Sequence, residues 1–412
     1  MKLAIIVRNN KRMIKNEYFK KGAHIMKSFE FYNPEHLIFG NGTFAQLETL
    51  PMPGKKACIV CTPSRRYVDR AIEMLGKNGV ECVVYDKCRQ NPDTRTINAG
   101  AKFAAENGCD FVLSIGGGSS TDTAKCMAVL MYNGVDDDIW DYVAYYEGHK
   151  EPKGCAPIVV VSTTSGTGTE GDQSGVLTNE FKNIKLDVAY PCMWPVYSIV
   201  DPELQTSVPP FYTACQGMDV IFHCTESYLD KYHTPYTDMT NTTGLKYAAA
   251  AIETAYNHPD DIEARAHMAV ASNLAGISES MVDLISLHAA GHTLGSIHHD
   301  VPHGYALCLM APVMFEWYTH YPKEVPERMA YLARLVGYGD TAEDYKRFII
   351  DKLKALDMYY LDYSVYGIDP ARCEEYGHKM VEGIAPYMDK DEITITVEQA
   401  TELFRRALAP RK

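Results

Sequence analysis

The sequence predicts an α/β N-terminal domain built on a parallel, Rossmann-like sheet, followed by an all-helical C-terminal domain. Short apolar runs alternate with helical patterns as far as residue 202, which is typical of a parallel sheet with helices on both faces. Beyond residue 210 the patterns become longer and helical, with few strand-like runs. The length of 412 residues also favours two domains, because it exceeds what one ordinary core holds.

The predicted parallel strands are continuous apolar runs, as expected of strands buried on both faces, and they cover residues 56–61, 80–85, 111–115 and 157–162. The helical patterns of this half cover residues 43–50, 67–78, 94–107 and 122–131. Gly79 and Gly108 follow two of these patterns, where a helix commonly ends. Residues 29–39 alternate loosely and end at a glycine turn, so we expect a strand or hairpin there.

The C-terminal half is predicted to be helical over residues 211–231, 241–257, 262–282, 322–337, 341–356 and 397–408. A proline-rich stretch at 201–210 separates the halves, so the predicted domains are residues 26–205 and 206–412. Residues 1–25 carry seven lysines and arginines against one acid, and Met26 opens a stretch that already reads as folded protein. We interpret residues 1–25 as an appended or mis-started segment, with a genuine basic arm as the alternative.

Composition excludes some partners. The net charge of −13 argues against nucleic acid and anionic membranes, and no apolar run is long enough to cross a bilayer. The 12 cysteines are scattered without a secretory signal before them, which favours reduced thiols in a cytoplasmic protein. Cys58 and Cys61 form a CxxC inside an apolar run, and without a second close pair we interpret them as buried thiols.

Two glycine-rich loops follow predicted strands. Gly116, Gly117, Gly118 and Ser119 lie between a strand and a helix, where backbone N–H groups and a helix N-terminus suit a phosphate or pyrophosphate; the alternative is a simple tight turn. Residues 162–170 (STTSGTGTE) follow the strand at 157–162; the alternative is a flexible surface loop. In an open parallel sheet ligands bind at the carboxyl ends of strands, so the two loops together favour one nucleotide crevice.

A dense group of histidines predicts a metal site. Residues 288–303 hold five histidines, and His288 and His292 share the i, i+4 spacing of Asp219 and His223 upstream. In a helix this spacing puts both side chains on one face. One carboxylate with several imidazoles suits Fe²⁺ or Zn²⁺, whereas Ca²⁺ and Mg²⁺ prefer oxygen ligands. The alternative is that these histidines are ordinary core or surface residues.

The last histidines of this group are harder to assign. His303 follows a proline and is expected in a loop. His298 and His299 are adjacent, and in an extended chain they would point to opposite sides, so both cannot readily join one site. Asp300 could orient a neighbouring imidazole, as carboxylates behind metal ligands do.

These motifs resemble the iron-containing (group III) alcohol dehydrogenase family from Met26 to the C-terminus. The shared stretches are SIGGGSSTDTAK (114–125), PIVVVSTTSGTGTE (157–170), IKLD (184–187), VDPEL (200–204), GMDVIFHCTES (217–227), ARAHMAVASNLAG (264–276), HAAGH (288–292) and VPHG (301–304). The resemblance implies a metal-dependent alcohol dehydrogenase or aldehyde reductase that transfers hydride between a small alcohol or aldehyde and NAD(P). It also implies a homodimer or higher homo-oligomer.

Matching residue by residue, the resemblance implies a role for each candidate. Iron, or zinc, would be held by Asp219, His223, His288 and His303. His292 would lie near the nicotinamide and relay a proton. The cofactor would be bound at its pyrophosphate by Gly116, Gly117, Gly118 and Ser119, along its length by Thr163 and Thr164, at a ribose by Lys185, and on the adenosine side by Asn91.

Two departures from the family pattern affect these expectations. The segment between HAAGH and VPHG looks one residue longer than usual, so we expect the loop with His298 and His299 to differ in shape from the family's. Thr62 stands where NAD-preferring members often have an aspartate for the adenine ribose. Without that aspartate, no carboxylate would repel the 2′-phosphate of NADP(H), and Arg65 or Arg66 could bind this phosphate. The sequence therefore slightly favours NADP(H) over NAD(H). The alternative is that both arginines are simply solvated.

Three rival interpretations remain at this point. A dehydroquinate-synthase-like or a glycerol-dehydrogenase-like enzyme would share the overall plan, and a non-catalytic protein could keep the metal and nucleotide sites. The spacing of Asp219 with His223 and the VPHG stretch fit alcohol dehydrogenases better than the first. A complete ligand set together with His292 argues against the last.

Overall fold

The structure is a computed structural model that describes residues 28–322 and 324–411. Asn33–Lys412 form one compact unit. Residues 28–32 belong to a separate unit, and they lie in neither helix nor strand. The segment interpreted as appended, residues 1–25, lies outside the described residues.

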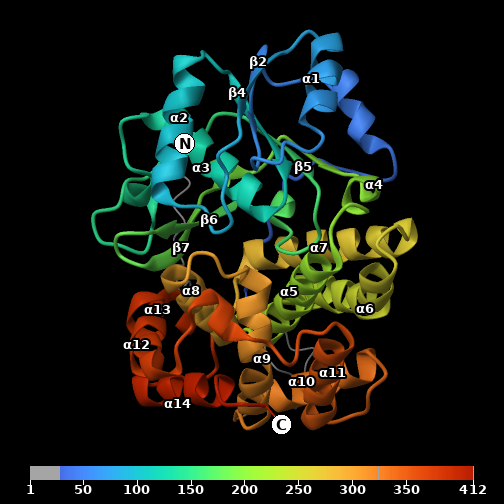
Figure 1. Ribbon diagram of the computed structural model, residues 1–412, viewed down its shortest axis with the longest axis vertical. Coiled ribbons are helices and arrows are strands. Elements are labelled where there is room, and N and C mark those ends of the chain that lie inside the picture. The colour runs from blue at the N-terminus through green and yellow to red at the C-terminus, as the bar shows by residue number, and fades with distance from the viewer. Residues whose placement is uncertain (1–27, 323, 412) are drawn as a thin grey trace, which may run out of the picture. The chain divides into compact units, whose positions relative to one another are not determined.

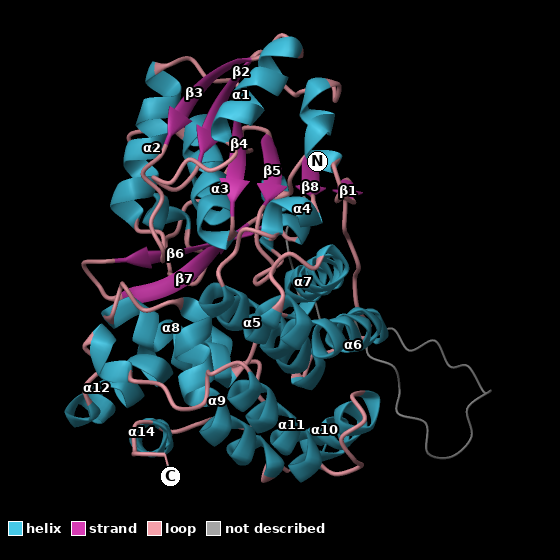
Figure 2. Cartoon of the chain, turned by 45° about the vertical axis from the view of Figure 1, so that its right-hand side comes forward, coloured by secondary structure: helices cyan, strands magenta, loops and turns pink. Residues whose placement is uncertain are grey.

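A six-stranded, wholly parallel sheet forms the N-terminal half (Figure 2). Its strands, in spatial order, are β1 (Leu37–Phe39), β8 (Tyr197–Val200), β5 (Ile158–Ser162), β4 (Phe111–Gly116), β2 (Lys56–Val60) and β3 (Glu81–Tyr85). The helices between these strands are α1 (Val68–Lys77), α2 (Thr94–Glu106) and α3 (Gly118–Asn133). The predicted α/β class is therefore confirmed.

Successive side chains of each strand enter two different cores, because a strand points its side chains alternately to opposite faces. Ile59 and Leu113 pack in a core with Val68 of α1. Cys58 and Val112 face the other side and join a core with α2 and α3. Both faces are apolar, which is why the strands read as unbroken apolar runs.

An antiparallel hairpin that the sequence did not reveal lies beside the sheet. It consists of β6 (Ser174–Asn179) and β7 (Ile184–Ala189), and it contacts both α3 and α8 (Figure 2). Gly175 lets β6 approach α3 closely, since a Cβ there would lie 2.8 Å from Cys126 Sγ. The hairpin matters for the site because β7 carries Lys185 and Asp187.

The remaining chain is helical, as predicted (Figure 1). Its helices are α4 (Pro202–Gln205), α5 (Pro210–Leu229), α6 (Pro235–Asn257), α7 (Ile262–Val282), α8 (Ser286–Ile297), α9 (His303–Thr319), α10 (Glu324–Leu335), α11 (Ala342–Ala355), α12 (Cys373–His378), α13 (Ala385–Met388) and α14 (Val397–Ala407). Short 3₁₀ turns lie at Thr43–Glu48, Ile139–Tyr142, Thr169–Gly171, Pro191–Met193, Tyr363–Tyr366 and Pro370–Arg372, and a π-turn at Lys379–Gly383. None of the described helices is both long enough and apolar enough to cross a membrane.

Two predicted helix starts were wrong, and one predicted strand is shorter than expected. The strand or hairpin expected at 29–39 is a strand, β1, confined to Leu37–Phe39. α6 begins at Pro235 rather than at 241, because the side chain and backbone of Thr234 form a reciprocal capping box with Thr237. α3 begins at Gly118 rather than at 122, so the glycine loop is itself the first turn of the helix.

His303 was expected in a loop, and this was also wrong. It is the first residue of α9, with Pro302 at the N-cap. Proline suits this position, because its fixed φ fits a helix start and its missing N–H would have no partner there in any case. A rigid helix, rather than a loop, therefore holds His303.

Candidate active site

Two of the predicted metal ligands project from one face of α5. Asp219 and His223 are one helical turn apart and nearly fully buried. Nε2 of His223 lies 3.4 Å from Oδ1 of Asp219. The i, i+4 spacing read from the sequence therefore produces the expected convergence.

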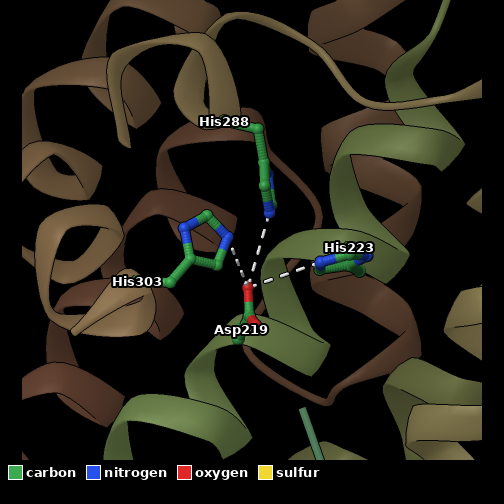
Figure 3. A group of neighbouring side chains, drawn as sticks. All are labelled: Asp219, His223, His288 and His303. Atoms are coloured by element: carbon green, nitrogen blue, oxygen red, sulfur yellow. Dashed lines mark ion pairs between the residues drawn. The ribbon is translucent and has the colours of Figure 1, made fainter. Parts of the chain in front are cut away.

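The other two predicted ligands come from α8 and α9. Nε2 of His288 lies 3.4 Å from Oδ1 of Asp219, and Nε2 of His303 lies 3.6 Å from the same oxygen (Figure 3). Gly304 makes this approach possible, because a Cβ there would lie 2.1 Å from the carbonyl oxygen of Cys215 on α5. The close contact between α9 and α5 thus brings His303 to Asp219.

The four side chains fit a transition-metal ion. One ligand atom from each of Asp219, His223, His288 and His303 lies within 4.8 Å of the others. Oδ1 of Asp219 and Nε2 of both His223 and His288 are buried and have no hydrogen-bond partner among the residues that the structure describes. Buried polar atoms without partners are costly, and a bound cation would satisfy them. Three imidazoles and one carboxylate suit Fe²⁺ or Zn²⁺.

The ionisation of Asp219 and His303 agrees with this interpretation, whereas nearby carboxylates, Glu279 and Glu226 first, raise the pKa of His223 and His288 against the effect of burial, so metal binding would release protons from them. Burial by itself would raise the pKa of Asp219, but the imidazoles of His303 and His223 hold it well below its usual value. Burial, followed by the nearby charge of Lys185, keeps the pKa of His303 well below its usual value. A charged carboxylate and a neutral imidazole are the forms that bind metal.

Two carboxylates stand behind the imidazoles, and the sequence analysis identified neither. Nδ1 of His288 donates to Oε1 of Glu226 at 2.6 Å, which leaves Nε2 free to accept a metal. Nδ1 of His223 lies 3.2 Å from Oε2 of Glu279. The orienting role suggested for Asp300 was therefore assigned to the wrong residue, since Asp300 is exposed at the turn after α8.

His292 lies beside the metal group without belonging to it. Its ring packs against His303 with a centroid separation of 5.2 Å and edge-on against Tyr387 at 5.0 Å. It is buried, and Nδ1 has no hydrogen-bond partner. Burial, and next the charge of Lys185, hold the pKa of His292 well below its usual value, so the ring is neutral.

The unexplained pair His298 and His299 points away from this group. Nε2 of His298 is 2.9 Å from the hydroxyl of Tyr376, and Nε2 of His299 donates to the carbonyl of Ser296 at 2.9 Å. Both histidines hold the turn between α8 and α9. The apparent extra residue therefore leaves His303 as the imidazole that reaches Asp219.

A cavity of about 650 Å³ opens from the metal group along the sheet edge, and the residues matched to metal binding, cofactor binding and proton transfer all line it. These residues are Thr62, Asn91, Gly116, Gly117, Gly118, Ser119, Thr163, Thr164, Lys185, Asp219, His223, His288, His292 and His303. The loops that follow β2, β4 and β5 meet here because the carboxyl ends of parallel strands lie at one edge. One cavity thus connects a helix N-terminus to the metal group.

The two glycine-rich loops touch each other in the cavity wall. A Cβ on Gly117 would lie 2.6 Å from Oγ1 of Thr164, and one on Gly118 would lie 2.8 Å from Oγ1 of Thr167. Only glycine therefore lets the first turn of α3 lie against the second loop. The free N–H groups at this helix start suit a pyrophosphate.

Lys185 and Asn91 form a pair that links the hairpin to the metal side of the cavity. Nζ of Lys185 donates to Oδ1 of Asn91 at 3.0 Å. Nδ2 of Asn91 donates to the carbonyls of His299 and Val301, just before His303. Burial lowers the pKa of Lys185 to about 8, although Asp122 and Asp219 oppose that shift.

The wall after β2 has no carboxylate among residues 61–67. Thr62, Ser64 and Arg66 line the cavity there, and the Thr62 and Ser64 hydroxyls are 2.9 Å apart. Arg65, the other arginine considered from the sequence, is not among the lining residues.

Comparison with known proteins gives the family. Residues 34–202 match the iron-containing alcohol dehydrogenases, and residues 213–364 match the C-terminal domain of the same family. The chain is 35% identical to a choline dehydrogenase of Bacillus subtilis over 68% of its own length and 69% of the relative's. It is 32% identical to alcohol dehydrogenase 4 of Saccharomyces cerevisiae over 76% of its length and 81% of that protein's.

Comparison with solved structures supports the same family. An archaeal halo-thermophilic alcohol dehydrogenase from a Red Sea brine pool, bound to NZQ, superposes with a TM-score of 0.88 at 27% identity, covering 93% of this chain and all of the other. A sulfoacetaldehyde reductase from Bifidobacterium kashiwanohense in complex with NAD⁺ superposes with a TM-score of 0.81 at 26% identity and the same coverage. The chain is therefore an alcohol/aldehyde oxidoreductase that belongs to the iron-containing alcohol dehydrogenase family.

Proposed function

We propose that Asp219, His223, His288 and His303 hold one Fe²⁺ or Zn²⁺ ion, and that a nicotinamide cofactor lies in the cavity beside it. The observation that carries this proposal is the convergence of four ligand atoms within 4.8 Å at one end of the glycine-lined cavity. When bound, the metal would supply Lewis-acid stabilisation of the alcohol oxygen, and the nicotinamide would exchange the hydride.

In this proposal, residues of the chain bind each part of the cofactor. The N–H groups at the start of α3 bind the pyrophosphate, with Gly117 and Gly118 allowing its close approach. Thr163 and Thr164 lie along the cofactor. Lys185 reaches a ribose hydroxyl from its position beside Asn91, whose assignment to the adenosine side stays a prediction.

His292 moves the proton in this proposal. Its neutral, buried ring lies beside His303 and has an unpartnered Nδ1, so it can accept the proton that the alcohol releases. In the aldehyde-reducing direction the same ring returns a proton. The substrate class is a small alcohol or aldehyde, and the assembly is a homodimer or higher homo-oligomer.

We propose further that NADP(H) is slightly favoured over NAD(H). Thr62 provides no carboxylate to repel a 2′-phosphate, and Arg66 lines the same part of the cavity. The NAD⁺ complex of the sulfoacetaldehyde reductase shows that a related fold accepts the cofactor without this phosphate. Initial rates with each cofactor at matched concentration decide the question: a higher kcat/KM with NAD(H) would reject the NADP(H) preference.

The proposed function is tested on protein of measured iron and zinc content, assayed against a range of alcohols and aldehydes with both cofactors. We expect substrate-dependent formation or loss of NAD(P)H. His288→Ala should abolish metal binding and turnover together, because it removes one ligand and leaves Oε1 of Glu226 without its imidazole partner. His299→Ala is the matched control, since its side chain bonds only to Ser296 outside the cavity, and it should keep both. Normal metal content and activity in His288→Ala would reject the ligand assignment.

A further inference from the structure

Glu279 is a carboxylate beside the metal group that also faces the cavity. It lies in the last turn of α7, and it lines the cavity between the metal group and the β6–β7 hairpin. Oε2 is 3.2 Å from Nδ1 of His223. About one-eighth of the side chain remains accessible, at 13%.

Glu226 provides the comparison, because it performs the equivalent task for His288. Its oxygens accept from Nδ1 of His288 at 2.6 Å and from the backbone N–H groups of Ile285 and His288 at 3.1 and 3.2 Å. It is fully buried and does not line the cavity. Glu279 differs from Glu226, because it reaches the cavity and no backbone N–H group of the described residues donates to it.

Two further carboxyls, Asp187 and Asp283, lie close enough to Glu279 to interact with its charge. Burial and next the charge of Glu279 raise the pKa of Asp187 to about 6. Burial and next the charge of Asp187, with Glu279 contributing, raise the pKa of Asp283 well above its usual value. Among the described residues, neither Glu279 nor Asp187 forms an ion pair with a lysine or arginine. Asp283 has only Lys390, at 3.8 Å.

The other nearby lysines are already engaged. Nζ of Lys125 is fully buried and bonds to Asp172 at 2.6 Å and to three backbone carbonyls. Lys185 donates to Asn91. Glu279 therefore has no lysine or arginine partner among the described residues, and it lies beside the ligand atoms where an alcohol oxygen would bind.

The separation between Glu279 and the metal-ligand atoms determines where a substrate would have to carry a positive charge to pair with Glu279. Glu279 is separated from the converging ligand atoms by the width of the His223 imidazole, with Nε2 on the metal side and Nδ1 on the Glu279 side. A cation attached to the carbon next to the carbinol carbon would lie within reach of the carboxylate while the hydroxyl occupied the metal side. A negatively charged substituent at that place would be repelled.

We propose that the site selects an alcohol with a positively charged nitrogen on the carbon next to the carbinol carbon, with Glu279 as the partner of that charge. This inference rests on the proposed function and names the substrate class of the same site. The reaction is the ordinary oxidation of alcohol to aldehyde: the carbinol carbon loses a hydride to the nicotinamide, the hydroxyl loses its proton, and the nitrogen is unchanged.

The test uses metal-loaded enzyme and two probes of equal shape. Choline carries the cation, and its tert-butyl analogue has a neutral carbon in place of the nitrogen. We expect wild-type kcat/KM for choline to exceed that for the analogue by about tenfold or more, as for a buried charge contact. Isethionate, whose sulfonate is negative, should be the poorest of the three.

Glu279→Gln removes the charge and keeps an oxygen at the position that lies 3.2 Å from Nδ1 of His223. Any effect through His223 should lower kcat/KM for both probes alike, so the loss for choline should exceed the loss for the tert-butyl analogue by about tenfold or more. Glu279→Asp, which keeps the charge, should retain the preference for choline. Metal content is measured for each variant.

Several outcomes overturn the proposal. Equal wild-type use of choline and its analogue, or a preference for isethionate, contradicts it. Equal losses for both probes in Glu279→Gln make Glu279 a positioning residue for His223 only. These results leave the proposed function intact if the analogue is oxidised, whereas a metal-loaded enzyme that oxidises no alcohol and reduces no aldehyde with either cofactor rejects both proposals.

Discussion

Glu226 connects the metal group to the helix that carries His288. One oxygen accepts from Nδ1 of His288, and the other accepts from the backbone N–H groups of Ile285 and His288. It therefore orients the imidazole and satisfies free N–H groups at the start of α8, where no side chain of α8 itself provides a cap.

Replacing this carboxylate should weaken metal binding more than its distance from the metal suggests. Gln at position 226 has a single acceptor oxygen, and its NH₂ group would face N–H donors, so at least one hydrogen bond to His288 or Ile285 is lost. We expect Glu226→Gln to lower metal affinity by about 10- to 100-fold, as measured by competition with a chelator.

A surface pair supplies the control for this prediction. Oε1 of Glu382 lies 3.1 Å from Nδ1 of His378, but both side chains are exposed and outside the cavity. Glu382→Gln should leave metal affinity unchanged. If both variants bound metal as the wild type does, the orienting role of Glu226 would be excluded.

For single residues, the sequence revealed the metal ligands but not the carboxylates that contact the ligand imidazoles. Asp219 and His223 were predicted because their spacing is a local property of one helix. Glu226 continues the same stripe at i+7, and this was the signal that could have identified it. Glu279 has no such signal, because only the tertiary packing of α7 against α5 brings it to His223.

Among the elements, α9 depends on one glycine to reach the metal group. The first turn of α9 contacts the backbone of α5 at Cys215, and a Cβ on Gly304 would lie 2.1 Å from that carbonyl oxygen. Gly304→Ala must push the start of α9 away from α5 and move His303 from Asp219. We expect a loss of about 1–3 kcal/mol in the free energy of unfolding and weaker metal binding, measured by urea denaturation and metal titration.

Gly76 offers the matched control for a helical glycine. It lies in α1, and a Cβ there would meet no atom within 4 Å. Alanine is the better helix former, so Gly76→Ala should raise the free energy of unfolding by about 0.5–1 kcal/mol without changing metal affinity. Equal effects of the two substitutions would contradict the close-approach argument for Gly304.

The helices and strands were predicted correctly where the pattern of apolar residues fits only one kind of element, and they were missed where the pattern is mixed. The apolar runs that became β2, β4 and β5 are buried on both faces, so they have no rival interpretation at that length. The β6–β7 hairpin was missed because its strands have mixed polarity and pack against α3 and α8 instead of the sheet. The start of α9 was missed because the proline before His303 was interpreted as a loop signal.

At the scale of the whole molecule, the two architectural halves share one hydrophobic core. Val60 and Val160 of the sheet and Leu130 of α3 belong to the same buried cluster as Leu294 of α8 and Leu307 of α9. The chain passes between the halves once, through the stretch predicted from its prolines. The single connection shows where the α/β half ends and the helical half begins. The continuous core makes each half depend on the other for stability.

The predicted domains 26–205 and 206–412 should therefore not unfold independently. A shared core adds its contacts to both halves at once, so the loss of one half exposes apolar surface on the other. We expect calorimetry of the metal-free chain to show a single transition with equal calorimetric and van't Hoff enthalpies, and a fragment of residues 26–205 to lack cooperative unfolding. Two resolved transitions, or a cooperatively folded fragment, would instead establish residues 26–205 as an autonomous domain with the metal group carried by a separable partner.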